Sequence, residues 1–186
     1  MSGHQPNLDF QPDRQDLSLG WVTDPPIRQL DPGEVALCGR WLLNVIKEFQ
    51  KEPGNTPAFI NRLTDAHERA EVLELQTDPA ECQVYAYFHS GKPVGMMSVD
   101  RAWSLRNGSV HIDSLAGHPA ARNVGDILIE FAVNLSQSRG AGGRVTLTAE
   151  GGARGFYESL GFQPLLPSGW QEGWTACVLR PRPPQW

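Results

Sequence analysis

The 186-residue sequence has few cysteines and no long apolar run. Its three cysteines, Cys38, Cys82 and Cys177, are widely scattered, with no Cys-x-x-Cys pair and no metal-ligand spacing. No stretch approaches the ~20 apolar residues of a membrane span, and no apolar run follows the first residues as in a signal peptide. These absences argue against a disulfide scaffold, a metal site and a membrane protein. They predict buried thiols in a cytoplasmic protein.

Basic residues are also fewer than acidic residues. Lys and Arg number 16 against 21 Asp and Glu, which gives a formal net charge of −5. A general nucleic-acid-binding protein needs a broad basic surface to neutralise phosphates, so we expect no nucleic acid as partner. The length suits one domain with a sizeable core, and no linker or internal repeat divides it.

Composition divides the chain into an arm, a domain and a tail. Residues 1–20 are rich in Gln, Asp, Pro and Asn without any period, which predicts a flexible N-terminal arm. Residues 21–180 form the predicted domain, in which Ile27 to Leu30 is a candidate edge strand. Residues 181–186 are predicted to be an exposed tail, because their prolines do not suit a sheet ladder.

Two helices and three strands are predicted in the first half of the domain. One helix has a cap signature in Asp31, Pro32 and Glu34, and a second begins after Thr56. From residue 83 the apolar period changes to two, and residues 83–89 and 94–100 flank a short turn. The second strand is expected to continue towards Trp103. Asn107-Gly108 is a strong hairpin signal that should return the chain into residues 109–115 as a third antiparallel strand.

The stretch from Val110 to Leu135 joins a strand to an amphipathic helix through a polar turn. The turn, from Gly117 to Gly125, exposes backbone amides at a helix start, where unpaired N–H groups and the helix dipole favour an anion. The pattern predicts a nucleotide or coenzyme site, and a plain helix start without a ligand is the alternative. The glycines at 140–143 follow a helix rather than a strand and are interpreted as a helix stop.

The remaining elements are short. A strand over residues 144–149, a helix over 153–160, and strands over 162–166 and 174–179 are predicted. Two segments of this chain resemble the GCN5-related N-acetyltransferase (GNAT) superfamily. The first is L-A-G-H-P at 115–119 followed by R-N-V-G at 122–125, which is similar to the Leu-x-Val-x-Pro strand end and the Gln/Arg-x-x-Gly-x-Gly/Ala pyrophosphate loop of the superfamily. The second is A-R-G-F-Y-E-S-L-G-F at 153–162, which is similar to its Ala-x-x-Phe-Tyr-Glu-x-Leu-Gly-Phe segment. The resemblance runs over about residues 83–179. It implies a single mixed α/β domain with a central, mostly antiparallel sheet flanked by helices.

The resemblance implies acetyl-CoA as the donor. The pyrophosphate would lie on the amides of the turn and helix start, which are those of Arg122, Asn123, Val124, Gly125, Asp126 and Ile127. The pantetheine would lie along Leu115, Ala116 and Gly117, where this strand splays from the strand over 144–149, and an N–H there would polarise the thioester carbonyl. Four residues depart from the family pattern: Gly117 replaces an apolar residue, Asp126 adds a negative charge, Ile127 replaces Gly or Ala, and Glu150 replaces a common Asn.

Acetyl transfer to an amine needs a deprotonated nucleophile and a proton for the departing thiolate. Tyr157 is the candidate acid, because a phenol with a reference pKa of about 10 is protonated at neutral pH and the resemblance places it beside the coenzyme sulfur. His111 and Asp113 are the candidate base and ammonium anchor, because residues two apart on a strand share one face, here with Leu115. A core tyrosine, a structural histidine and a loop-capping aspartate are the alternatives.

Three further residues are weighed in the same way. Glu150 is a secondary base candidate or a turn cap, His118 is interpreted as an exposed loop histidine, and Trp103 as packing rather than pocket lining.

The predicted function is acetyl-CoA-dependent N-acetyltransfer to a primary amine by direct attack. A catalytically degenerate acyl-CoA-binding or protein-interaction domain on the same fold is the alternative, suggested by Asp126, Ile127 and Glu150. The expected partners are coenzyme A and an amine that the sequence does not identify, and dimers are common in the resembled family.

Overall fold

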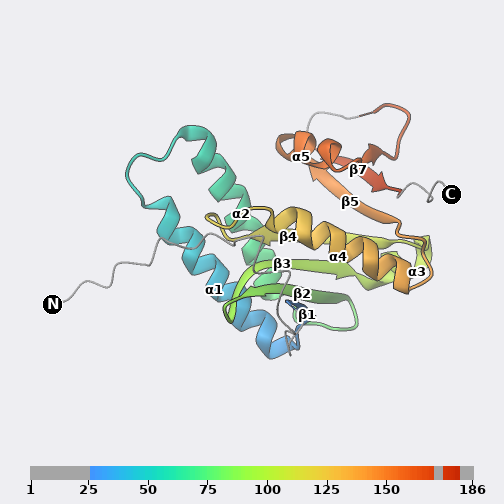
Figure 1. Cartoon of the computed structure of the whole chain (residues 1–186), viewed down its shortest axis with the longest axis horizontal. Helices are drawn as coiled ribbons and strands as arrows, with labels where there is room; N and C mark the ends of the chain where they lie inside the picture. Colours follow the sequence, from blue (N-terminus) through green and yellow to red (C-terminus); the bar gives the residue numbers. More distant parts are fainter. Residues whose placement is uncertain (1–25, 170–173, 181–186) are drawn as a thin grey trace.

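The computed structural model describes residues 26–169 and 174–180 (Figure 1). The predicted arm and tail lie outside these ranges. The described residues form one sheet of seven strands in the order β1-β2-β3-β4-β5-β7-β6, with helices on both faces. Neighbouring strands are antiparallel except for β4 and β5, which are parallel. The predicted mixed α/β fold with a mostly antiparallel sheet is confirmed.

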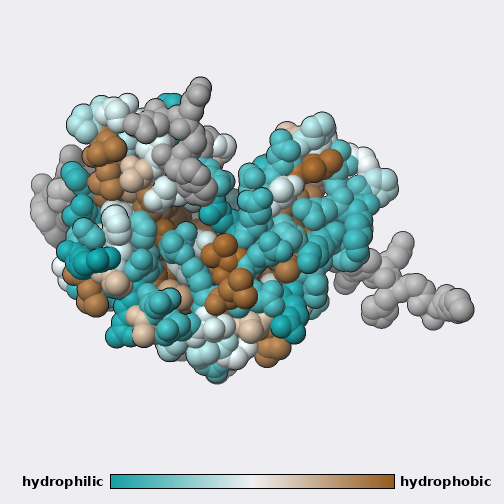
Figure 2. Space-filling view, turned by 180° about the vertical axis from the view of Figure 1, so that it is seen from behind, coloured by the Kyte–Doolittle hydropathy of each residue, from teal (hydrophilic) through white to brown (hydrophobic). Residues whose placement is uncertain are grey.

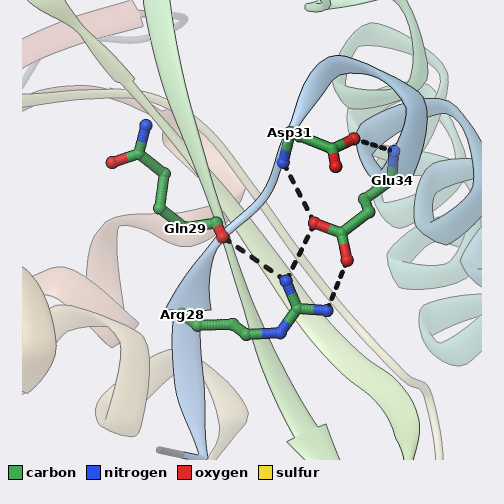
Figure 3. Close-up of polar contacts among 4 residues, drawn as sticks. All are labelled: Arg28, Gln29, Asp31 and Glu34. Carbon is green, nitrogen blue, oxygen red and sulfur yellow. Dashed lines mark hydrogen bonds and ion pairs between the residues drawn. The ribbon is translucent and has the colours of Figure 1, made fainter.

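The chain enters the sheet through the edge strand β1 (Ile27–Gln29) and turns at once into α1 (Pro32–Gln50). The predicted cap is present: the Glu34 N–H donates to Asp31 Oδ1 at 2.8 Å, and the Asp31 N–H donates to Glu34 Oε2 at 3.1 Å (Figure 3). Arg28 donates to both carboxylate oxygens of Glu34, at 2.8 and 2.6 Å. These hydrogen bonds lower the pKa of the Glu34 carboxyl to about 2 and join strand to helix.

Helix α2 (Pro57–Leu75) packs beside α1 on one face of the sheet. The two helices approach closely at Gly39, where an added Cβ would lie 2.7 Å from Glu74 Cα. Under them lies a cluster of buried apolar side chains, which we call the α1/α2-side core; it includes Leu42, Ile46, Leu63, Leu73, Val84, Met96 and Ala116. Burial of this set is the main force that holds both helices on the sheet.

A helix replaces the hairpin that was predicted around Asn107. Strands β2 (Cys82–His89) and β3 (Lys92–Asp100) form the expected hairpin, but the chain then turns into α3 (Arg101–Asn107) before β4 (Val110–Gly117). Asp100 caps this helix by accepting from the Trp103 N–H at 2.7 Å, and Gly108 ends it at φ 56°. The prediction of a strand towards Trp103 was therefore wrong, because Asn-Gly also suits a left-handed helix end.

Helix α4 (Val124–Ser138) covers the opposite face of the sheet (Figure 1). It packs on a second apolar cluster, the α4-side core, which includes Tyr85, Met97, Val99, Val110, Ile112, Leu128, Ala132, Val145 and Leu147. At Gly95 an added Cβ would lie 2.2 Å from Val124 Cγ1, so the start of α4 needs this glycine. The glycines at 140, 142 and 143 have positive φ and follow α4, as the predicted helix stop requires.

The remaining strands lie on the far side of β4. They are β5 (Val145–Glu150), β6 (Gln163–Pro164) and β7 (Trp174–Leu179), and a short turn (Gly151–Ala153) with α5 (Arg154–Ser159) connects β5 to β6. The predicted strand over 162–166 is shortened to β6. Phe162 is instead buried in the α4-side core.

Candidate active site

The parallel strands β4 and β5 are paired at one end and apart at the other. Their ladder joins only Val110 to Ile112 with Val145 to Leu147. Beyond it, residues 114–117 of β4 remain paired with β3, and residues 148–150 of β5 remain paired with β7. No ladder within the described residues joins these two stretches to each other, so they bound a wedge. Figure 2 shows a notch at the upper edge of the surface, between the lobe with α2 and the lobe with α5 and β7.

A β-bulge lies where the wedge begins. Ser98 pairs with Ser114 while Val99 pairs with Ile112, so Asp113 is an extra residue in β4. An extra residue bends a strand and shifts its alternation. Leu115 consequently packs on the α4-side core, whereas Ala116 belongs to the α1/α2-side core. The predicted common face of His111, Asp113 and Leu115 is therefore wrong for Leu115.

The start of α4 faces the end of β4. An added Cβ at Gly117 would lie 3.1 Å from Val124 Cγ1. Asn123 precedes the helix in the left-handed conformation, with φ 59°, and makes no side-chain cap. Among the described residues no hydrogen bond takes the N–H groups of Val124, Gly125 and Asp126, whereas the Ile127 N–H donates to Asn123 O at 3.0 Å. Three amides at the positive end of a helix can therefore hold an anion.

The residues at the turn differ in where their side chains lie. Ile127 packs on the α4-side core and so points at apolar neighbours. Gly125 lies under Phe156 of α5: an added Cβ would be 2.7 Å from the ring carbon Cζ. A glycine is needed there because the aromatic ring covers the helix start. Phe156 is a contact that the sequence motif did not reveal.

Tyr157 is packed beside two rings, with centroid distances of 5.1 Å to Phe156 and 5.4 Å to Phe162. Burial raises the pKa of its phenol to about 12, with Cys177 and Glu150 raising it further and Arg69 lowering it. The hydroxyl is therefore protonated throughout the neutral range. It is a weaker acid than the free phenol assumed from the sequence.

An ion pair connects α2 to the end of β5. Arg69 Nη2 lies 2.7 Å from Glu150 Oε1, and both residues act on the pKa of Tyr157. Glu150 is thus paired with a cation instead of capping the following turn. Arg69 was missed in the sequence because its charge resembled the solvated face of a helix.

His111 lies at the paired end of β4 with its imidazole held on several sides. Its Nδ1 is hydrogen-bonded to Thr146 Oγ1 at 3.0 Å, and its backbone N–H donates to Ser104 Oγ at 3.0 Å. The Trp103 ring lies against it with a centroid distance of 4.6 Å. Burial lowers the pKa of His111, and this effect is larger than the opposite effect of the Asp100 and Asp113 carboxylates, which raise it. The ring is therefore neutral at physiological pH and can accept a proton.

Asp113 is exposed, and its Oδ2 accepts from Gln76 Nε2 at 2.5 Å. The Oε1 atom of Gln76 is buried without a partner among the described residues. No described hydrogen bond joins Asp113 to His111, and none joins either residue to Tyr157. Thr146, rather than Asp113, orients the imidazole, and the three candidate catalytic residues do not form a contiguous network.

His118 is half-buried, so its prediction as an exposed loop histidine was wrong. Its ring lies 5.9 Å from that of Trp41 and 5.6 Å from that of Phe49, both on α1. Burial lowers its pKa. The loop after β4 is thereby anchored to α1.

Two searches of the described ranges concern other classes of site. In residues 26–169 and 174–180, no three His, Cys, Asp or Glu side chains gather as ligands for a metal ion. No helix in the same ranges is both long enough and apolar enough to span a membrane.

A protein-family model described as the acetyltransferase (GNAT) family matches residues 44–162. The fold is similar to that of an aminoglycoside 6'-acetyltransferase type Ii, with a TM-score of 0.54 and 18% identity over 84% of this chain and 99% of that chain. It is also similar to the PaiA N-acetyltransferase from Thermoplasma acidophilum in complex with coenzyme A, with a TM-score of 0.54 and 12% identity over 83% and 97% of the two chains. A putative N-acetyltransferase from Lactobacillus plantarum has a TM-score of 0.52 and 14% identity over 83% and 97%. A search of curated proteins finds no match.

Proposed function

This chain belongs to the acetyltransferase (GNAT) family, and we propose that it transfers the acetyl group of acetyl-CoA to a primary amine by direct attack. The observation that carries the proposal is the separation of β4 from β5 after Ile112. Among the described residues, backbone groups on one edge of β4 are left without a strand partner, next to a helix start with three unpaired amides. Such groups need hydrogen-bond partners, and a ligand with amide and phosphate groups provides both kinds.

The residues present fit the donor predicted from the resemblance. The edge of residues 115–117 suits an extended chain with amide groups, and the amides from Arg122 to Ile127 suit a pyrophosphate. Structures with this fold include one in complex with coenzyme A from Thermoplasma acidophilum. The departure at Ile127 weighs less than the sequence suggested, because its side chain packs against the α4-side core.

Bound acetyl-CoA supplies a thioester, whose C–S bond breaks as the new C–N bond forms. We assign His111 to the proton that the amine loses, because burial lowers its pKa and keeps its ring neutral. Tyr157 donates its hydroxyl proton to the departing sulfur, and the proton on His111 returns to the phenolate through solvent. Asp113 accepts hydrogen bonds from the incoming ammonium before deprotonation. At a pKa of about 12 the Tyr157 hydroxyl keeps its proton at neutral pH and is a weaker acid than a free phenol.

Calorimetric titration with acetyl-CoA tests the donor site. We expect micromolar binding to the wild-type protein and loss of binding in Gly125→Arg, which fills and crowds the helix start under Phe156. Leu37→Arg is the matched control, because it adds the same charge on the exposed face of α1. Equal binding in both variants would contradict the assignment.

Turnover then distinguishes an enzyme from a binding domain. We expect free thiol to be released from acetyl-CoA in the presence of at least one primary amine from a panel of polyamines, aminoglycosides, amino acids and peptides. Binding of acetyl-CoA without thiol release from any of them would favour the degenerate acyl-CoA-binding domain.

A further inference from the structure

A cavity of about 510 Å³ lies at the opposite end of β4 from the proposed coenzyme site. It is bordered by α3, by Ser109 and Val110 at the start of β4, and by Arg139 and Ala141 after α4. The wedge, by contrast, lies beside Gly117 and the first residues of α4. At about 3.3 Å per residue, the length of β4 separates the two places by roughly 20 Å. The cavity is of the size that small-molecule sites have.

Both charged residues that line the cavity are arginines, Arg101 and Arg139. Arg139 Nη2 donates to Gln83 Oε1 at 2.5 Å and to Tyr85 Oη at 3.1 Å, and Arg101 Nη1 donates to Pro79 O at 3.2 Å. These partners are neutral oxygens. In the described part of the chain neither guanidinium forms an ion pair, and no Asp or Glu lines the cavity.

This arrangement is unusual for the chain, whose formal net charge is −5. Arg101 and Arg139 give the cavity a positively charged lining, from which a bound anion can accept charge-assisted hydrogen bonds. Guanidinium groups are suited to carboxylate and phosphate because their donors form a planar fork. Leu105, Val110 and Ala141 add apolar surface to the same cavity, which suits an organic ligand better than an inorganic ion.

We propose that this cavity binds a small organic anion, through Arg101 and Arg139, separately from the acetyl-CoA site. The carboxylate or phosphate of the ligand accepts hydrogen bonds from the two guanidinium groups, and its carbon skeleton contacts Leu105 and Val110. Ser104 belongs to the wall rather than to the ligand set, because its hydroxyl donates to Asp100 O and accepts from the His111 N–H. The site is independent of the proposed function, since none of the proposed coenzyme-binding residues contributes to it.

The test is calorimetric titration of the full chain with succinate and, separately, with glycerol 3-phosphate, in the presence and absence of saturating coenzyme A. We expect one of the two probes to bind, which tells whether carboxylate or phosphate is preferred, and we expect coenzyme A not to displace it. Arg101→Gln and Arg139→Gln should each weaken binding by about tenfold or more, as expected for loss of a charge-assisted hydrogen bond. Arg106→Gln is the matched control, because Arg106 is exposed on the same helix but does not line the cavity.

Three outcomes would overturn the proposal. They are no binding of either probe to the wild-type protein, the same probe affinity in Arg101→Gln and Arg139→Gln as in the control Arg106→Gln, and displacement of the probe by coenzyme A. Arg139→Gln also removes contacts to Gln83 and Tyr85, so its folding must be checked by circular dichroism. Arg101→Gln, which loses only a bond to a backbone carbonyl, decides the question if Arg139→Gln is misfolded.

Discussion

The two ends of the β4–β5 pair differ in their hydrogen bonding. At the paired end, Val110 to Ile112 are bonded to β5, and the side chain of His111 is bonded to Thr146. At the open end, residues 113–117 have no partner on the β5 side within the described chain, and three amides of α4 are free. A single extra residue, Asp113, separates the two. The proposed donor site therefore lies where the ladder stops.

Close packing of α4 and α5 surrounds the open end of β4. Gly95 and Gly117 both lie against Val124, and Gly125 lies against Phe156. Each glycine allows the Val124 side chain or the Phe156 ring to approach the backbone closely. These contacts fix the start of α4 close to the end of β4.

The largest effect is expected at the open end from Tyr157→Phe. Removal of the hydroxyl removes the proton donor for the leaving thiolate, so thiol release with an accepted amine should fall by about 100-fold or more, within the range for a general acid. The affinity for acetyl-CoA should be nearly unchanged. Tyr87→Phe is the matched control, because the Tyr87 hydroxyl is buried without a described partner. Similar rates for both variants would remove Tyr157 from the mechanism.

The second effect concerns the packing behind the open end. In Gly95→Ala the new methyl group meets Val124 Cγ1 at 2.2 Å, so the start of α4 must shift. Overpacking of this kind costs about 1–3 kcal/mol in the free energy of unfolding, measurable by urea denaturation, and it should also weaken acetyl-CoA binding. In Gly155→Ala nothing lies within 4 Å of the added atom, and that control should be as stable as the wild type or more stable. Unaltered coenzyme binding in Gly95→Ala would show that the position of α4 is unimportant.

The third effect is at the paired end. Thr146→Val removes the hydrogen bonds to His111 Nδ1 and to Ser109 Oγ while keeping the side-chain shape, and should cost about 2 kcal/mol of stability. Because the imidazole loses its orientation, kcat should fall while acetyl-CoA binding is retained. Thr148→Val, at an exposed position of the same strand, is the comparison. If both variants have wild-type kcat, the paired end contributes only to folding.

The smallest effect is on the pH dependence of stability. Burial lowers the pKa of His111 and of His118 below the usual histidine value of about 6.5. The unfolded chain therefore binds protons first, so stability is full above about pH 6.5 and is lost as the pH falls through the lower folded-state pKa values. Glu34, with a pKa of about 2, retains its charge in this window. Urea unfolding at about pH 7.5 and about pH 5.5 measures the decrease in the free energy of unfolding between the two pH values. This decrease should be smaller for His118→Phe than for the wild type, and an equal decrease would show that His118 does not cause it.

Features that depend on neighbouring residues in the sequence were predicted well. The cap of α1 at Asp31 and Glu34, the strand-to-helix joint at residues 110–135 and the helix stop at 140–143 all follow from local backbone chemistry. The local signal at Asn107-Gly108 was ambiguous, because a left-handed residue pair closes a hairpin or ends a helix. The cap from Asp100 to Trp103 decided between them.

Features that depend on register and on distant segments were not predicted. The bulge at Asp113 follows from the pairing of β3 with β4, and it alone reverses the face of Leu115. Thr146 and Arg69 come from segments 35 and more residues away from the side chains they contact, and no spacing in the sequence connects them. The roles of Tyr157, His111 and Asp113 remain predictions.

The most direct test of the central claim is hydrogen exchange of backbone amides with and without acetyl-CoA. We expect slower exchange on binding in residues 113–117 and 122–127, and unchanged exchange in residues 110–112 and 145–147, whose amides belong to the existing ladder. Protection confined to other segments, or no protection at the open end despite saturating coenzyme, would contradict the claim that the separation of β4 from β5 forms the donor site.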